Sequence, residues 1–245
     1  MEIMAEGGQI LAAILRKVAG AVRPGISTLE LDNLAREELN KAGVKSAFEG
    51  YRMGGDGPAY PAVICTSIND EVVHGIPRAD EILKEGQIIG LDFGVIHKGL
   101  YTDAALTVAV GKIDSEDARL LKVTKQALQA GIDQVKAGNT IGDVAFAIES
   151  AAKAAGFSVV RDLIGHGVGH ELHEKPDVPN YGRPGTLEKL QPGMVIAIEP
   201  MFTRGGWRIK FADDQWTVKT ADNSHAAHFE HTMAVTDSGH RVLTE

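Results

Sequence analysis

Apolar positions recur along this chain at helical spacing in some segments and form strand-like runs in others. The first helical segment covers about residues 5–21, where the sequence has the pattern of an amphipathic helix. Further helices are expected within residues 22–43, 115–134 and 135–156. Residues 90–106, GLDFGVIHKGLYTDAAL, predict a β-hairpin, because two largely apolar runs flank a short turn.

Each arm of this hairpin carries one aspartate. A two-residue loop at His97 and Lys98 places Asp92 directly opposite Asp103 on one face, whereas a three-residue loop shifts the pairing by one. Two carboxylates this close repel each other, and burial adds to the cost. If the pair is not simply solvated, a shared proton or a cation must compensate.

The chain also contains a half-chain repeat, because residues 22–43 align without a gap on residues 135–156. Both segments end at AlaGly, a common helix end. Each begins with a pair that resembles a capping box: Ser27 with Glu30, and Thr140 with Asp143.

The repeat continues into the strands, where KEGQIIGLD (84–92) resembles QPGMVIAIE (191–199) and TDAALTV (102–108) resembles FEHTMAV (229–235). These alignments place Asp92 on Glu199 and Asp103 on Glu230. We therefore predict one pseudo-twofold α/β domain over residues 1–245, with halves of about 1–112 and 113–245. The halves close one sheet that has helices on one face, and the other face gathers four carboxylates that need cations.

Histidines supply further candidate ligands. LIGHGVGHELHE contains His166, His170 and His173, and His74 ends the apolar stretch of SINDEVVHGIP, although a polar loop would also be rich in histidine. Oxygen ligands with one imidazole and no thiolate favour Mn, Fe, Co or Zn ions, and shared carboxylates suggest two of them. Such a pair activates water for hydrolysis. An amide substrate is favoured, because the sequence has no phosphate-binding loop.

Composition and charge narrow the class of protein. The chain has 245 residues, of which 44% are hydrophobic and 24% charged, as in ordinary globular proteins. Its single cysteine, Cys65, excludes an internal disulfide and fits a reducing compartment, so we expect a cytoplasmic location. No apolar run has the length of a membrane span. The net charge of −8, without a basic run, argues against a nucleic-acid-binding protein.

Five motifs together resemble the type I methionine aminopeptidases of the pita-bread fold: SINDEVVHGIP, LDFGVIHKGLYTDAA, GHGVGHELHE, AIEPM and FEHTMAVT. They occur in the family's order and span nearly the whole chain. The resemblance implies an α/β (α+β) pita-bread fold, in which a pseudo-twofold antiparallel sheet carries helices on its outer face. A dinuclear metal site would lie at its centre.

Carried over by position, the resemblance implies five metal ligands: Asp92, Asp103, His166, Glu199 and Glu230. Asp103 and Glu230 would bridge two divalent ions of Co, Mn, Fe or Zn. Glu199 would also carry protons during catalysis. His74 and His173 match the two histidines that contact the substrate around the scissile amide.

The resemblance also implies a pocket for the methionine side chain, and ordinary core packing is the alternative. The matching positions are Tyr60, Cys65, Leu172 and Trp216. Leu172 stands where an aromatic residue is often found, and the GlyGlyAspGly stretch at 54–57 lacks a second tyrosine. We predict that WRIKFADDQWTVKT, between Glu199 and Glu230, forms a hairpin that walls this pocket.

The expected reaction is removal of the initiator methionine from new polypeptides when the second residue is small. The expected partners are nascent N-termini and, transiently, the ribosome; we expect a monomer that binds neither a membrane nor nucleic acid directly. The alternatives are an Xaa-Pro aminopeptidase or dipeptidase, a non-catalytic peptide-binding module of the same fold, and a metallophosphoesterase. His231 and Thr232, after Glu230, favour the methionine-specific branch.

Overall fold

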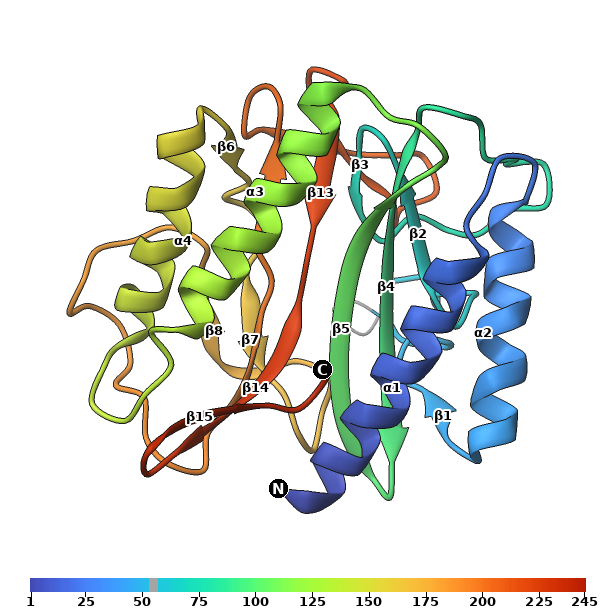
Figure 1. Cartoon of the computed structure of the whole chain (residues 1–245). Helices are drawn as coiled ribbons and strands as arrows, with labels where there is room; N and C mark the ends of the chain where they lie inside the picture. The colour runs from blue at the N-terminus through green and yellow to red at the C-terminus, as the bar shows by residue number, and fades with distance from the viewer. Residues whose placement is uncertain (53–56) are drawn as a thin grey trace.

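The computed structural model describes residues 1–52 and 57–245, and four helices in this part lie beside the strands (Figure 1). The helices are α1 (Glu2–Ala21), α2 (Thr28–Ala42), α3 (Ser115–Ile132) and α4 (Ile141–Ala155). In the view of Figure 1, α1 and α3 lie in front of the strands, with α2 and α4 flanking them. The four helical segments predicted from the sequence are thus confirmed. No helix among the described residues is long and apolar enough to cross a membrane.

Helices α2 and α4 begin and end in the same way. The side chains of Ser27 and Thr140 each accept a hydrogen bond from the backbone three residues later, and the acid there bonds back, which completes a capping box at each helix start. Gly43 and Gly156 end the two helices with φ values of 67° and 75°, in the left-handed region that glycine tolerates best. The repeat therefore appears as matched helix boundaries.

Fifteen strands accompany the helices in the described residues, and every pairing is antiparallel. They are β1 (Lys45–Ser46), β2 (Cys65–Ile68), β3 (Glu71–Val73), β4 (Ile88–His97), β5 (Leu100–Ala109), β6 (Ser158–Val159), β7 (Gly165–Gly167), β8 (Glu174–Val178), β9 (Val195–Ile198), β10 (Met201–Thr203), β11 (Ile209–Phe211), β12 (Val218–Thr220), β13 (Ala226–His228), β14 (His231–Thr236) and β15 (Gly239–Val242).

The described strands divide into four hydrogen-bonded sheets, whereas the sequence predicted one. The two largest contain β1, β2, β4 and β5, and β7, β8, β9, β14 and β15. Ala105 and Glu230 join them by exchanging two backbone hydrogen bonds of 2.8 and 3.4 Å. Glu230 lies in a two-residue break between β13 and β14, so pairing is interrupted where the two parts of the chain meet. The two largest of the four sheets are therefore separate at this break.

The hairpin of β4 and β5 has a different register from the predicted one, and the prediction of Asp92 directly opposite Asp103 is wrong. The loop consists of Lys98 and Gly99, one residue later than expected, and Asp103 pairs with Gly94. Lys98 and Gly99 have φ values of 50° and 83°, and a tight hairpin turn of this kind needs positive φ at both residues. The pairing shifts by two positions, so Asp92 and Asp103 still share a face, as diagonal neighbours.

Two apolar clusters fill the space between helices and strands. One packs α1 and α2 against β4 and β5; its fully buried members include Leu11, Leu31, Ile89 and Phe93. The other packs α3 and α4 against β9 and β14; its members include Leu120, Ile148, Ile196 and Met233. The division at about residue 112 into two halves of one domain stays a prediction.

Candidate active site

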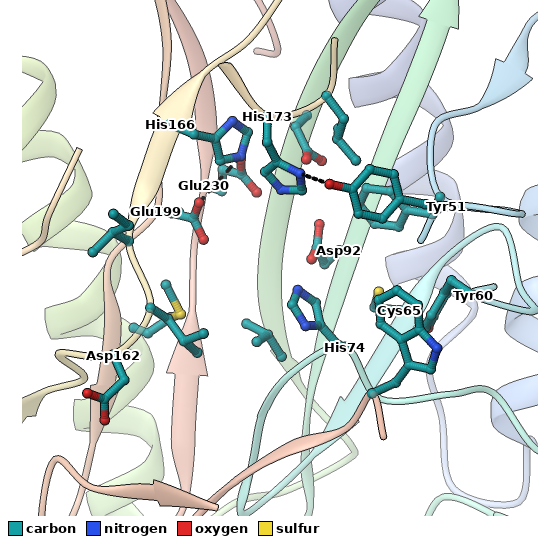
Figure 2. Close-up of a pocket in the computed structure, with 18 residues that line it drawn as sticks. Tyr51, Tyr60, Cys65, His74, Asp92, Asp162, His166, His173, Glu199 and Glu230 are labelled. Carbon is teal, nitrogen blue, oxygen red and sulfur yellow. Dashed lines mark hydrogen bonds and ion pairs between the residues drawn. The ribbon is translucent and has the colours of Figure 1, made fainter. Parts of the chain in front are cut away.

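A cavity of about 340 Å³ opens beside the strands, and its lining falls into two parts (Figure 2). We call the first the acid end, which consists of Asp92, Asp103, His166, Glu199 and Glu230. We call the second the apolar end, which consists of Phe48, Tyr51, Tyr60, Cys65, Leu172 and Trp216. His74 and His173 line the same cavity. Eleven of the twelve candidate residues named from the sequence therefore line one cavity, and His170 does not.

The acid end is built from regular strands and the residues next to them. Asp92 lies on β4, Asp103 on β5 and His166 on β7. Glu199 directly follows β9, and Glu230 directly precedes β14. The aligned acids of the half-chain repeat thus meet from opposite sides, because the repeated strands face each other across the cavity.

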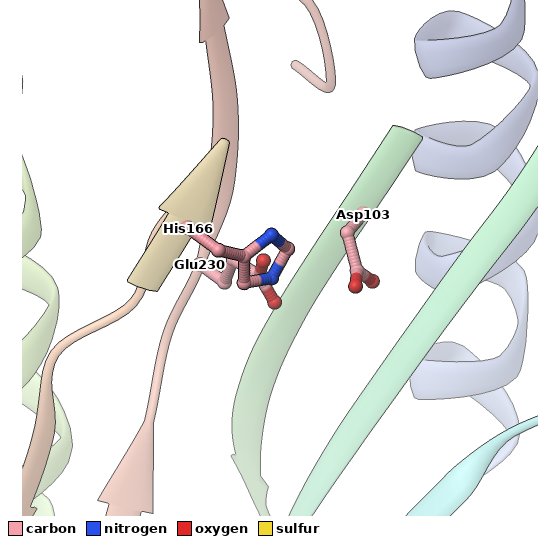
Figure 3. Close-up of side chains that lie close together, drawn as sticks. All are labelled: Asp103, His166 and Glu230. Atoms are coloured by element: carbon pink, nitrogen blue, oxygen red, sulfur yellow. The ribbon is translucent and has the colours of Figure 1, made fainter. Parts of the chain in front are cut away.

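Three of these residues approach closely enough to share one cation (Figure 3). Asp103, His166 and Glu230 each offer a ligand atom, and these atoms lie within 4.8 Å of one another. Glu199 adjoins this group, with its Oε1 3.6 Å from Nε2 of His166. Asp92 lies on the neighbouring strand and completes the carboxylate set.

The carboxyl groups of the acid end are held in an unfavourable environment. Burial raises the pKa of Asp92, Glu199 and Glu230 well above the usual range, and the neighbouring carboxyls raise it further. Burial likewise raises the pKa of Asp103 to about 7. No lysine or arginine is among the described residues that line the cavity, so no side chain there offsets this charge.

Two buried oxygens of this set, Oδ1 of Asp92 and Oε1 of Glu230, have no hydrogen-bond partner among the described residues. An unpartnered buried polar atom is costly, and the oxygen-rich donor set with one imidazole is the type that divalent metal ions prefer. The residues therefore fit a divalent cation.

Hydrogen bonds from neighbouring groups orient two of these candidate ligands, His166 and Asp103. Nδ1 of His166 lies 2.9 Å from the carbonyl oxygen of Gly167, which can only accept, so Nδ1 carries the proton and Nε2 presents a lone pair to the acid end. The backbone N–H of Asp103 donates to Oγ1 of Thr232 at 2.9 Å, and that hydroxyl donates to the carbonyl oxygen of Asp103 at 2.7 Å. Thr232 thus clamps the backbone that presents Asp103.

His74 and His173 face the cavity as neutral imidazoles. Burial, together with a smaller contribution from His173, lowers the pKa of His74 to about 4. The pKa of His173 is also lowered to about 4, first by desolvation within the cavity and then by His166, whose ring centroid is 4.3 Å away. His74 has φ 61°, a left-handed conformation that a histidine rarely adopts and that marks a constrained site.

The apolar end gathers four predicted residues from distant segments, and all four are buried: Tyr60, Cys65, Leu172 and Trp216. The rings of Tyr60 and Trp216 meet edge to face at 5.2 Å. The predicted hairpin is confirmed as β11 and β12, and Trp216 lies in the turn between them. Residues 54–56 of the GlyGlyAspGly stretch lie outside the described residues.

Two further residues of interest were missed in the sequence. Tyr51 lines the apolar end, and its hydroxyl lies 2.7 Å from Nδ1 of His173. His228 is buried, with its Nε2 3.5 Å from Oε2 of Glu199 and 4.0 Å from Oε2 of Glu230. His228 precedes Glu230 by two positions, and the period of two in extended chain was a signal for a shared face.

Comparison with protein families decides the relationship. The model of metallopeptidase family M24 matches residues 2–237. The chain belongs to this family. The M24 assignment confirms the predicted resemblance and the pita-bread fold. It also agrees with a metal-dependent hydrolase, and the acid end of the cavity fits a divalent cation.

Curated relatives of this M24 chain are named methionine aminopeptidases. The protein of Clostridium acetobutylicum is 45% identical over 100% of this chain and 95% of its own length. Methionine aminopeptidase 1 of Mycobacterium tuberculosis is 44% identical over 100% of this chain and 92% of its own. The predicted branch of the family is therefore confirmed.

Solved M24 structures agree with the sequence relationships. The methionine aminopeptidase of Thermotoga maritima has a TM-score of 0.95 and 43% identity, and the match covers 100% of this chain and 96% of that one. An Xaa-Pro dipeptidase of Bacillus anthracis has a TM-score of 0.74 and 23% identity, with 100% of this chain and 60% of that one covered. This second likeness shows the shared fold only.

Proposed function

We propose that this chain removes the N-terminal methionine from polypeptides whose second residue is small. The observation that carries the proposal is one cavity in which a set of metal-ligand side chains adjoins an apolar wall. An acid end alone fits many hydrolases, and an apolar pocket alone fits many binding proteins. Their juxtaposition, in a chain 40–45% identical to curated relatives named methionine aminopeptidases, supports this reaction.

The acid end is the proposed site of two divalent cations, of Co, Mn, Fe or Zn. Its five ligands would be Asp92, Asp103, His166, Glu199 and Glu230, which all line the cavity. Bound there, such ions activate water and polarise the scissile carbonyl. Such a site would also offer a ligand position to a free α-amine, which would restrict cleavage to the first residue of a chain.

The remaining steps belong to side chains of this protein. Glu199 accepts the proton of the attacking water and passes it to the departing amine. His173 donates a hydrogen bond to the carbonyl oxygen as negative charge develops on it. His74 contacts the amide nitrogen and assists its departure. Both imidazoles are neutral, so each has one N–H to donate and one nitrogen to accept.

The apolar end is the proposed pocket for the methionine side chain. Tyr60, Cys65, Leu172 and Trp216 offer aromatic rings, a thiol and an aliphatic surface. A thioether is polarisable and unbranched, and it packs well against aromatic and sulfur-containing walls. The aromatic contacts would discriminate methionine from smaller first residues by apolar burial.

The substrates would be the N-termini of nascent polypeptides. A transient ribosome contact, a monomeric state and a cytoplasmic location complete the proposal, and each stays a prediction. None of them bears on the chemistry of the cavity.

The test is methionine release from Met-Ala-Ser by protein that is stripped of metal and then given Mn(II) or Co(II). An Ala-Pro-containing peptide serves as the parallel substrate. We expect metal-dependent methionine release and no cleavage of the proline peptide. Cleavage of the proline peptide instead would reassign the chain to Xaa-Pro chemistry. Metal binding without cleavage of either peptide would favour a non-catalytic peptide-binding module.

A further inference from the structure

Tyr51, at the apolar end of the cavity, contacts His173 through one short hydrogen bond. Its hydroxyl oxygen lies 2.7 Å from Nδ1 of His173, and the two ring centroids are 5.3 Å apart (Figure 2). We propose that Tyr51 is a positioning residue that donates this hydrogen bond, and so keeps the proton of His173 on Nε2 for the substrate carbonyl oxygen. The inference deepens the proposed function and rests on it for the role of His173.

The direction of this hydrogen bond decides what His173 can do. A neutral imidazole has one N–H donor and one bare acceptor nitrogen, whereas a phenol can donate or accept. Burial raises the pKa of Tyr51, and Glu171 raises it further, so the phenol keeps its proton near neutral pH. When the phenol donates to Nδ1, the N–H lies on Nε2, at the opposite edge of the ring.

The opposite tautomer is unsuited to this cavity. A proton on Nδ1 would leave a lone pair on Nε2, facing a cavity whose other end carries four carboxyl groups. Such a lone pair could not donate to a carbonyl oxygen that becomes negative in the reaction. Donation from Tyr51 therefore selects the tautomer that the proposed role of His173 requires.

The backbone of Tyr51 is itself fixed by the apolar end. Its N–H donates to the carbonyl oxygen of Phe48 at 2.9 Å, and its own carbonyl accepts from the N–H of Tyr60 at 2.8 Å. The Tyr51 ring packs on the apolar cluster that contains Tyr60 and Trp216. The same residue thus contacts the proposed methionine pocket with its ring and orients His173 with its hydroxyl. An alternative role is that Tyr51 serves only as a pocket wall.

The first experiment uses Tyr51→Phe, which removes the hydroxyl and keeps the ring. We expect kcat for Met-Ala-Ser to fall about tenfold to a hundredfold, because a disordered donor retains only part of its effect. KM should stay within about twofold, since the pocket wall remains. Tyr101→Phe is the matched control, because Tyr101 packs on the same cluster and its hydroxyl bonds no described residue. A loss that appears in KM, with kcat unchanged, would assign Tyr51 to the wall.

A double-mutant cycle separates positioning from packing. If Tyr51 acts through His173, Tyr51→Phe should have little further effect on kcat in a His173→Ala background. Equal losses in both backgrounds would overturn the proposal, since the hydroxyl would then act independently of His173.

The tautomer can also be measured without turnover. In metal-free protein labelled with ¹⁵N-histidine, the wild type should show His173 protonated at Nε2 and bare at Nδ1, with assignment by His173→Gln. Tyr51→Phe should shift this signal toward a mixture of tautomers. A wild-type proton on Nδ1, or an unchanged signal in the variant, would refute the inference. Because this measurement needs no catalysis, it remains decisive even if no methionine is released in the activity assay.

Discussion

The two ends of the cavity are built in different ways. The five residues of the acid end lie on β4, β5, β7, or directly beside β9 and β14. Most residues of the apolar end lie in loops, and only Cys65 belongs to a strand, β2. A set of metal ligands tolerates only small errors in the positions of its side chains, and paired strands fix such positions tightly. Loops, in contrast, can shape a pocket around one substrate side chain. The difference predicts that chemistry and selectivity respond to separate substitutions.

The largest expected effect comes from breaking the acid end. Asp103→Asn removes one of the proposed metal-ligand carboxylates, so kcat should fall by about a thousandfold or more, and one equivalent of metal should be lost. Asp162→Asn is the control, because Asp162 lines the same cavity but is exposed and forms no ion pair within the described residues. Activity and bound metal are measured together. Full turnover by Asp103→Asn would contradict the two-metal assignment.

The acid end should also make metal binding depend on pH. The pKa of Asp103 is raised to about 7, and burial raises those of Asp92, Glu199 and Glu230 well above their usual values, so a cation must displace protons. Raising the pH removes these protons beforehand, and affinity should rise about tenfold per pH unit for each proton displaced. Calorimetric titration with Mn(II) at pH 6 and 7, in buffers of different ionisation enthalpy, measures both quantities. Binding without proton release would show that the carboxyls are already ionised.

Glu71, on the chain segment that follows Cys65 of the apolar end, should make the free energy of unfolding depend on pH. It is buried on β3, which pairs with β12, and burial raises its pKa from 4.5 to about 7. The folded state therefore holds this proton more tightly than the unfolded state. The resulting stabilisation is complete below about pH 4.5 and is lost as the pH rises to 7, by up to about 3 kcal/mol.

Glu71→Gln should remove this pH dependence, because an amide does not titrate in this range. The amide oxygen can still accept the hydrogen bond from the N–H of Ile68, as Oε2 does at 2.9 Å. The free energy of unfolding of the variant should gain on that of the wild type between pH 5 and 7.5. Urea unfolding of the metal-free proteins measures the gap, and the other carboxyls cancel in the difference. A gap that stays constant with pH would mean that Glu71 is ionised in the folded protein.

The smallest expected effect comes from the apolar end. Trp216→Leu removes one aromatic wall, so the preference for methionine over alanine as the first residue should fall about tenfold, with metal affinity unchanged. Trp207→Leu is the control, because Trp207 stacks with Arg161 and Arg208 and does not line the cavity. The readout is the ratio of kcat/KM for the two substrates. A loss of metal affinity with intact selectivity would remove the distinction between the two ends.

The same contrast explains what the sequence could predict. Aligned acids such as Asp92 and Glu199 could be predicted, because side chains alternate with a fixed period along a strand and the two parts of the chain carry matching sequence patterns. The hairpin register was misjudged because the position of the turn depends on which residues accept positive φ. Lys98 and Gly99 take that conformation, which shifted Asp103 by two positions but kept it on the same face.

Contacts made by loop residues could not be predicted from the sequence. Tyr51 precedes Tyr60 by nine positions with a glycine-rich stretch between them, and no periodicity links such a residue to His173. In the fold, backbone hydrogen bonds to Phe48 and Tyr60 place it at the cavity. His228 was legible in principle from its spacing to Glu230, but a buried histidine is more often a packed core residue than a partner of acids.

The paired hydrogen bonds between Thr232 and Asp103 have a consequence for when the site is assembled during folding. These residues are 129 positions apart in sequence, and their reciprocal hydrogen bonds form only when the last strands have docked on the first hairpin. Before that docking, the chain contains the carboxyl side chains of the acid end, but they are not yet brought together as a set of candidate ligands. We therefore expect a chain in which this docking is incomplete to release no methionine from other newly made chains.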